Sequence, residues 1–303
     1  MISNSRRQAI TGALAVSVAA ILWGLDGIVL TPRLYNLNII WVVFVVHCIP
    51  FILMNFFLFR EYKHLKEFTR GDYLFMGLIS LFGGAIGTLA IVKALFLLNF
   101  QSLTVVVLLQ KLQPVFAITL AALLLKEKLK KHFLFWTGLA IVAGYLLTFG
   151  LSLPNFHTGF KTLYAALFAL LAAFSFGSST VFSKKILIKY NFITATFFRY
   201  GFTTLFMLVF VLATGKLSQV YSTTSFNWFI FLIIGFTTGS GAIFLFYYGL
   251  KRIKAILATI CELFFPMSAI LFDYLFNHNR LSLVQWIGAA VMIFAIIRLN
   301  TEE

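Results

Sequence analysis

Ten long apolar stretches limit what this chain can fold into more than any other feature of its sequence. A helix needs about 20 mainly apolar residues to cross the hydrocarbon core of a bilayer, and backbone groups in lipid must form their hydrogen bonds within the helix itself. The sequence therefore predicts an all-α integral membrane protein with ten transmembrane helices. The predicted spans are 10–31, 38–59, 73–97, 102–125, 133–151, 162–183, 193–213, 227–249, 255–276 and 282–299.

Charged residues are few and unevenly placed. Only 11% of the residues are charged and 61% are hydrophobic, whereas about 25% of the residues in soluble domains are charged. If the N-terminus is cytoplasmic, 17 of the 24 Lys and Arg residues fall on the cytoplasmic side, four fall outside and three lie within spans. This bias predicts that both termini are cytoplasmic. It also explains the net charge of +15 as membrane topology, so we expect lipid headgroups and not nucleic acid as the charged partner.

The two halves of the chain repeat one pattern. A shift of 152 residues places Pro114 on Pro266 and Gln110 on Glu262. Each half holds five predicted spans, and because five is odd, the second half must enter the membrane upside down relative to the first. Inverted repeats with an interrupted helix in each half are typical of secondary transporters. We predict a first five-helix repeat at 1–151, an external connector at 152–161 and a second five-helix repeat at 162–303.

Short motifs recur in the same order in both halves. They are Trp23-Gly24 with Phe176-Gly177, and W-x-G at 136–138 with W-x-G at 286–288. In this arrangement the chain resembles the EamA-type drug/metabolite transporters over essentially its whole length. The resemblance implies a secondary transporter that holds its substrate between spans one to four and six to nine, as a multi-pass protein of the bacterial inner (plasma) membrane. One departure is Asn279, which stands opposite Glu127 of the first copy.

Ionisable side chains deep in a membrane are costly, and by default they mark a functional pathway. At about 1.5 Å per helical residue, Lys111 and Glu262 lie near the midplane, where neither reaches water along its own helix. We interpret both as facing an aqueous cavity or an opposite charge, and the alternative is a structural salt bridge between the halves. Arg199 either binds substrate or clamps a helix to Glu262 or Asp26.

Pro114 and Pro266 predict where two helices break. A proline has no N–H to donate to the carbonyl four residues earlier, so the carbonyls of Gln110 and Glu262 should be free. These oxygens suit an ammonium group or a proton, whereas the two basic side chains above suit a carboxylate. A zwitterion such as an amino acid fits this mixture. The alternative is that each proline only kinks its helix.

These features predict a secondary transporter of a small polar or zwitterionic metabolite and not an enzyme. The sequence contains no G-x-x-x-x-G-K-[ST] or H-E-x-x-H motif, so we expect no ATP, cofactor or metal. The alternatives are an organic-cation or drug transporter with an aromatic cage, and an intramembrane enzyme or lipid-handling protein. Glu262 is the predicted proton-coupling residue, because a buried carboxyl can gain a proton in one state and lose it in another. The predicted substrate-binding residues are Trp23, Asp26, Gln110, Lys111, Arg199, Tyr200 and Glu262.

Overall fold

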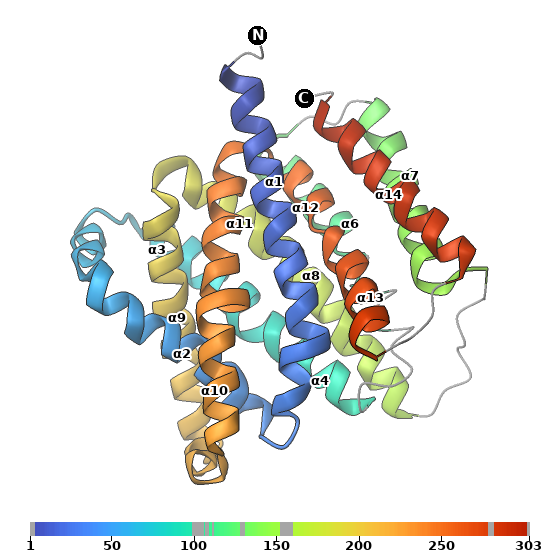
Figure 1. Cartoon of the computed structure of the whole chain (residues 1–303). Helices are drawn as coiled ribbons and strands as arrows, with labels where there is room; N and C mark the ends of the chain where they lie inside the picture. The colour runs from blue at the N-terminus through green and yellow to red at the C-terminus, as the bar shows by residue number, and fades with distance from the viewer. Residues whose placement is uncertain are drawn as a thin grey trace.

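The computed structural model describes residues 4–98, 106, 109–110, 112–127, 131–151, 160–277 and 282–301, and every element among them is a helix. The helices stand alongside one another in a single bundle, and the two ends of the chain lie at the same end of it (Figure 1). We call this the termini end, and the other the opposite end. The predicted all-α fold is confirmed.

Several predicted spans are composed of more than one helical piece. The elements of the first half are α1 (Asn4–Leu25), η1 (Asp26–Leu30), η2 (Thr31–Leu34), α2 (Ile39–Leu58), η3 (Phe59–Lys66), α3 (Arg70–Leu78), η4 (Ile79–Ile86), α4 (Gly87–Leu97), α6 (Gln113–Leu124) and α7 (Lys131–Phe149). Those of the second half are α8 (Phe160–Lys189), α9 (Phe192–Ala213), η5 (Lys216–Ser222), α10 (Ser225–Ile234), η6 (Gly235–Gly239), α11 (Ser240–Arg252), α12 (Ala255–Cys261), α13 (Phe264–Asn277) and α14 (Leu283–Thr301).

The described helices are long and apolar enough for a membrane protein. Seven helical runs among the described residues have the length and composition needed to cross a bilayer, and three shorter apolar helices lie at Gln113–Leu124, Leu134–Leu147 and Leu283–Arg298. Large hydrophobic side chains such as Phe56 and Phe57 are exposed, as expected where lipid covers the surface. The membrane fold is confirmed, while the total of ten spans and the cytoplasmic position of the termini stay predictions.

The helices pack across the two halves of the chain. Helix α1 of the first half packs against α11 and α13 of the second half. Its counterpart α8 of the second half packs against α4 and α6 of the first. The remaining large contacts join α2 to α9 and α7 to α14. A shift of about 152 residues exchanges the members of each of these contacts. This exchange fits an inverted repeat, and the boundaries of the two repeats stay a prediction.

Small residues allow the closest helix crossings. A β-carbon added at Gly249 of α11 would lie 2.4 Å from the carbonyl oxygen of Gly12 in α1. A β-carbon at Gly177 of α8 would lie 2.8 Å from the carbonyl oxygen of Gln113 in α6. Within a bilayer, close backbone approach of this kind supplies much of the packing energy between helices. The crossing at Gly177 also positions the candidate site.

Candidate functional site

The two prolines lie where helices begin. α6 begins at Gln113, so Pro114 occupies its first turn, where a missing backbone N–H costs nothing. In the second half α12 ends at Cys261 and α13 begins at Phe264, so a short turn at Glu262 and Leu263 separates them. Pro266 then lies in the first turn of α13. Both chain segments are therefore interrupted next to a polar residue of the predicted site.

One detail predicted from the prolines is wrong. The carbonyl oxygen of Glu262 is not free, because the backbone N–H of Phe265 donates to it at 2.9 Å. The turn tightens after Cys261, and an i to i+3 hydrogen bond replaces the one that Pro266 cannot make. What Glu262 offers to a ligand in this structure is therefore its side chain and not its main chain.

A pocket lies between the two interrupted segments, with Glu262 in its wall. The side-chain amide of Gln113 donates to Oε2 of Glu262, and the hydroxyl of Thr180 on α8 donates to Oε1 at 3.2 Å. Both carboxylate oxygens are thus held by neutral donors from different helices. The pocket is lined by Gln110, Gln113, Pro114, Thr259, Glu262, Leu263, Phe265 and Pro266.

Arg199 of α9 is buried, with 7% of its surface exposed, and its described partners are neutral. One terminal nitrogen donates to the hydroxyl of Tyr247 at 3.1 Å, and the other donates to the carbonyl of Gly83 in the π-helix η4 at 3.0 Å. Within the described residues its Nε has no partner. No ion pair joins it to Glu262 or Asp26 in that part of the chain. The predicted clamp to a carboxylate is therefore wrong here, and Arg199 instead links α9 to η4 and α11.

The other predicted residues lie apart from this pocket. Asp26 begins η1 and accepts a hydrogen bond from the Thr31 hydroxyl at 3.3 Å. Trp23 packs against Phe246, with 5.3 Å between the ring centroids. Tyr200 is 2% exposed. None of Trp23, Asp26, Arg199 and Tyr200 lines the pocket, whereas Gln110 and Glu262 both do. The prediction for Lys111 lies outside the described residues.

Sequence reasoning did not identify Gln113, Thr180 or Thr259. Gln113 stands one turn after Gln110 and immediately before Pro114, and this position was a usable signal. Thr180 follows Gly177 by three residues, so both lie on one face of α8. Gly177 lets α8 approach α6 closely, and the hydroxyl of Thr180 contacts Glu262 in the turn between α12 and α13. That approach depends on tertiary packing.

Known proteins resemble this chain over nearly its whole length. The sequence matches the EamA-like transporter family over residues 10–149 and 163–301. It is 53% identical over 292 residues to the riboflavin transporter ImpX of Fusobacterium nucleatum subsp. nucleatum, covering 96% of this chain and 98% of that protein. A protein of known crystal structure shares the fold, with a TM-score of 0.63 and 16% identity over 98% of this chain and 95% of that one.

Proposed function

We propose that this chain, which belongs to the EamA-like transporter family, carries riboflavin or a closely similar flavin. The protein is a multi-pass membrane transporter of a small metabolite and not an enzyme, and its place is the bacterial plasma membrane. The observation that carries the substrate proposal is the 53% identity with a riboflavin transporter along almost the full length of both proteins.

The chemistry of the pocket supports a neutral, hydrogen-bonding substrate. Its described lining holds two side-chain amides, one hydroxyl and one carboxyl group, together with the apolar surface of Leu263, Phe265 and two prolines. A flavin presents a flat ring that stacks on apolar and aromatic surface, and its carbonyls, imide N–H and ribityl hydroxyls match amide and carboxylate partners. Amides suit these groups because each amide both donates and accepts.

The same geometry gives less support to an amino acid. A zwitterion needs a cation and an anion within reach of one small molecule. We expected Lys111 and Arg199 to bind its carboxylate, and the oxygens of Gln110 and Glu262 to bind its ammonium group; of the two cations, the structure describes Arg199 alone. Arg199 does not line the pocket and is engaged by Tyr247 and Gly83. We therefore rank a flavin above an amino acid, and we keep amino acids and quaternary ammonium ions as competitors in the test.

Glu262 is the residue that we propose for substrate recognition and for proton coupling. It is the one acidic side chain among the described pocket residues, and the donors that hold it, Gln113 and Thr180, belong to α6 and α8. Movement of those helices changes the number of hydrogen bonds to the carboxylate. Each change alters how readily the group holds a proton, which is what coupling to a proton gradient requires.

Transport assays on purified protein in liposomes test both proposals. We expect saturable riboflavin uptake, measured by flavin fluorescence, that excess alanine and choline do not inhibit. Glu262→Gln should reduce uptake at least about tenfold, as expected for a lost charged hydrogen bond of about 1.5–3 kcal/mol, and should remove the response to a pH gradient. Glu67→Gln is the matched control, because the Glu67 side chain is 57% exposed and is not among the residues that line the pocket.

Two results would contradict these proposals separately. If alanine or choline is transported and riboflavin is not, the proposal that the substrate is a flavin is wrong. If Glu262→Gln transports riboflavin at the wild-type rate with the same dependence on the pH gradient, Glu262 neither recognises the substrate nor couples protons.

A further inference from the structure

The turn between α11 and α12, at the termini end of the bundle, is held by two charged side chains from other helices. Lys184 of α8 donates from its ammonium group to three backbone carbonyls of this turn. The distances are 2.8 Å to Leu250, 3.3 Å to Lys251 and 2.6 Å to Ile253. The last carbonyls of α11 have no partners within their own helix, so Lys184 caps the C-terminus of α11 from outside.

Glu127 caps the start of the next helix in the same manner. Glu127 follows α6 in the chain. Its carboxylate accepts hydrogen bonds from the backbone N–H groups of Ala255 at 3.0 Å and Ile256 at 3.1 Å. These are the first two residues of α12. A positive charge at a helix C-terminus and a negative charge at a helix N-terminus both match the helix dipole. We call Lys184, Glu127 and the backbone of 250–256 the clasp.

The clasp and the pocket lie at opposite ends of α6 and α12, with the clasp at the termini end. α12 packs against α6 and α8, and it runs from Ala255 at the clasp to Glu262 at the pocket. Seven residues of helix separate these points, which corresponds to about 10 Å. Every residue of α12 is buried. No route from the pocket to the termini end opens between these helices unless α12 moves away from α6 and α8.

We propose that the clasp is the gate at the termini end of the transport pathway, closed in this structure and released when the pocket opens to that end. α12 carries Thr259 and Glu262 of the pocket, and α6 and α8 carry Gln113 and Thr180. Separating these helices breaks five hydrogen bonds to charged side chains at once. The inference rests on transport by alternating access and does not depend on which metabolite is carried.

The repeat does not provide the same device at the opposite end. A shift of 152 residues places Glu127 on Asn279 and Lys184 on Pro32. Neither Asn nor Pro carries the charge that the clasp uses. The two charged groups of the gate at the termini end therefore have no charged counterparts at the symmetry-related positions. Neutralising them should increase access to the pocket from the termini end and not from the opposite end.

Thiol accessibility measured separately from each side distinguishes a gate from a purely structural cap. The background protein carries Cys48→Ala and Cys261→Ala, and Thr259→Cys places one reactive thiol in the pocket wall. A membrane-impermeant maleimide is then added to oriented vesicles from one side or the other. The variants are Lys184→Met and Glu127→Gln, and the matched control is Lys185→Met, which removes an exposed neighbouring lysine outside the clasp.

We expect Lys184→Met and Glu127→Gln each to raise the labelling rate from the termini end about tenfold, with a lower or unchanged rate from the opposite end. Lys185→Met should label as the background does. Lys184→Arg keeps a cationic donor and should restore slow labelling, which separates the gate from simple misfolding. Labelling that is unchanged in both clasp variants, or that rises equally from both sides, would overturn the proposal. Loss of thermal stability without a change in labelling assigns Lys184 and Glu127 to structure alone.

Discussion

Two helix starts at opposite ends of the bundle have the same local structure and different chemistry. α3 follows Thr69, whose hydroxyl accepts from the N–H of Asp72 at 3.3 Å while the Asp72 carboxylate accepts from the N–H of Thr69 at 2.8 Å. α10 follows Thr224, and Asn227 completes the same reciprocal pair at 3.2 and 3.1 Å. Both are capping boxes, and they occupy corresponding places in the two predicted repeats.

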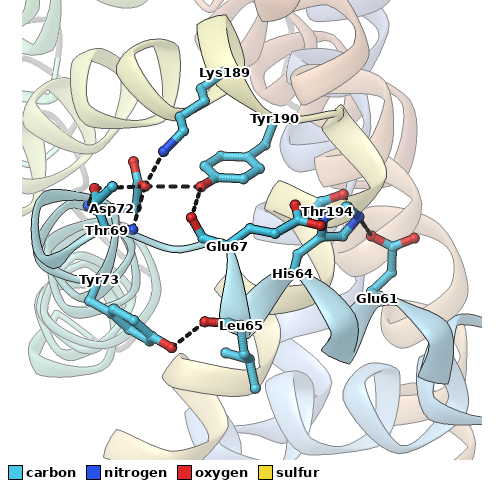
Figure 2. Close-up of polar contacts among 10 residues, drawn as sticks. All are labelled: Glu61, His64, Leu65, Glu67, Thr69, Asp72, Tyr73, Lys189, Tyr190 and Thr194. Atoms are coloured by element: carbon cyan, nitrogen blue, oxygen red, sulfur yellow. Dashed lines mark hydrogen bonds and ion pairs between the residues drawn. The ribbon is translucent and has the colours of Figure 1, made fainter.

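Their partners from the other half of the chain differ. Asp72 also accepts from the ammonium group of Lys189, the last residue of α8, and from the hydroxyl of Tyr190, which follows it, at 2.9 Å. Figure 2 shows these two side chains and Thr69 meeting at one carboxylate oxygen. Asn227 instead exchanges two amide hydrogen bonds with Asn36, each of 3.1 Å. One end is joined by charge and the other by neutral amides.

The difference shows what a repeat conserves in this molecule. The capping geometry depends on four consecutive residues alone, so the inverted second copy has it at α10 as the first copy has it at α3. The side chains that approach it come from a different face of the membrane, and the termini end is the basic one by our sequence prediction. An acidic residue there finds Lys189, whereas a charge at the opposite end would find mainly amides. A carboxylate should therefore stabilise the protein at the termini end and destabilise it at the opposite end.

The largest effect is expected for Asn227→Asp. Asn227 is 2% exposed, and its amide nitrogen donates to Asn36 and to the carbonyl of Arg33 at 3.3 Å. A carboxylate there loses both donations and faces a carbonyl oxygen. We expect the free energy of unfolding to fall by about 2 kcal/mol, measured as a lower melting temperature in detergent.

Asn191→Asp is the matched control for that variant. Asn191 is exposed and caps α9 by accepting from the N–H of Phe192 at 2.7 Å, and an aspartate does this equally well. If the two substitutions lower the melting temperature equally, the buried amide pair contributes nothing specific, and the comparison between the two ends fails.

A smaller effect is expected for Asp72→Asn. An asparagine oxygen in the same place still accepts from Thr69, so the capping box is kept, but the charge that strengthens the bonds from Lys189 and Tyr190 is lost. We expect a loss of about 1 kcal/mol. Since the termini-end pair is partly exposed, with 47% of the Lys189 side chain accessible, high salt should already weaken the wild-type contact.

The measurement is therefore made at low and at high salt. The difference in melting temperature between wild type and Asp72→Asn should shrink as salt is raised. A difference that stays constant would mean that geometry and not charge joins this end of the molecule.

Much of this architecture was readable from the sequence because it depends on local or periodic features. The apolar stretches predicted the helices, and Pro114 and Pro266 predicted where two of them are interrupted. The 152-residue shift paired Gln110 with Glu262, and both line the pocket. These features need only the chemistry of one segment, or the comparison of two segments with each other.

The remaining contacts depend on which neutral groups meet after folding. We expected Arg199 to pair with a carboxylate, but it donates to the phenol of Tyr247 and to the backbone carbonyl of Gly83. A carbonyl is present at every residue, so no sequence pattern indicates it. The donors to Glu262 come from positions 82 and 149 residues away. Glu127 likewise binds backbone N–H groups of α12, which no sequence pattern marks.

The smallest effect is expected for Lys189→Met, and it isolates the ion pair from the capping box. This substitution leaves the hydrogen bonds of Asp72 to Thr69 and Tyr190 in place and removes a single exposed cation. Exposed ion pairs contribute little, so the melting temperature at low salt should fall by only about 1 °C and at high salt not at all. Lys185→Met is the control, since that exposed lysine makes no ion pair among those found in the described residues. A fall as large as that of Asp72→Asn would mean that Lys189 alone carries the charged contact. No fall at either salt concentration would assign the contact to Tyr190 and the capping box, and the two ends of the transporter would then differ in sequence but not in what stabilises them.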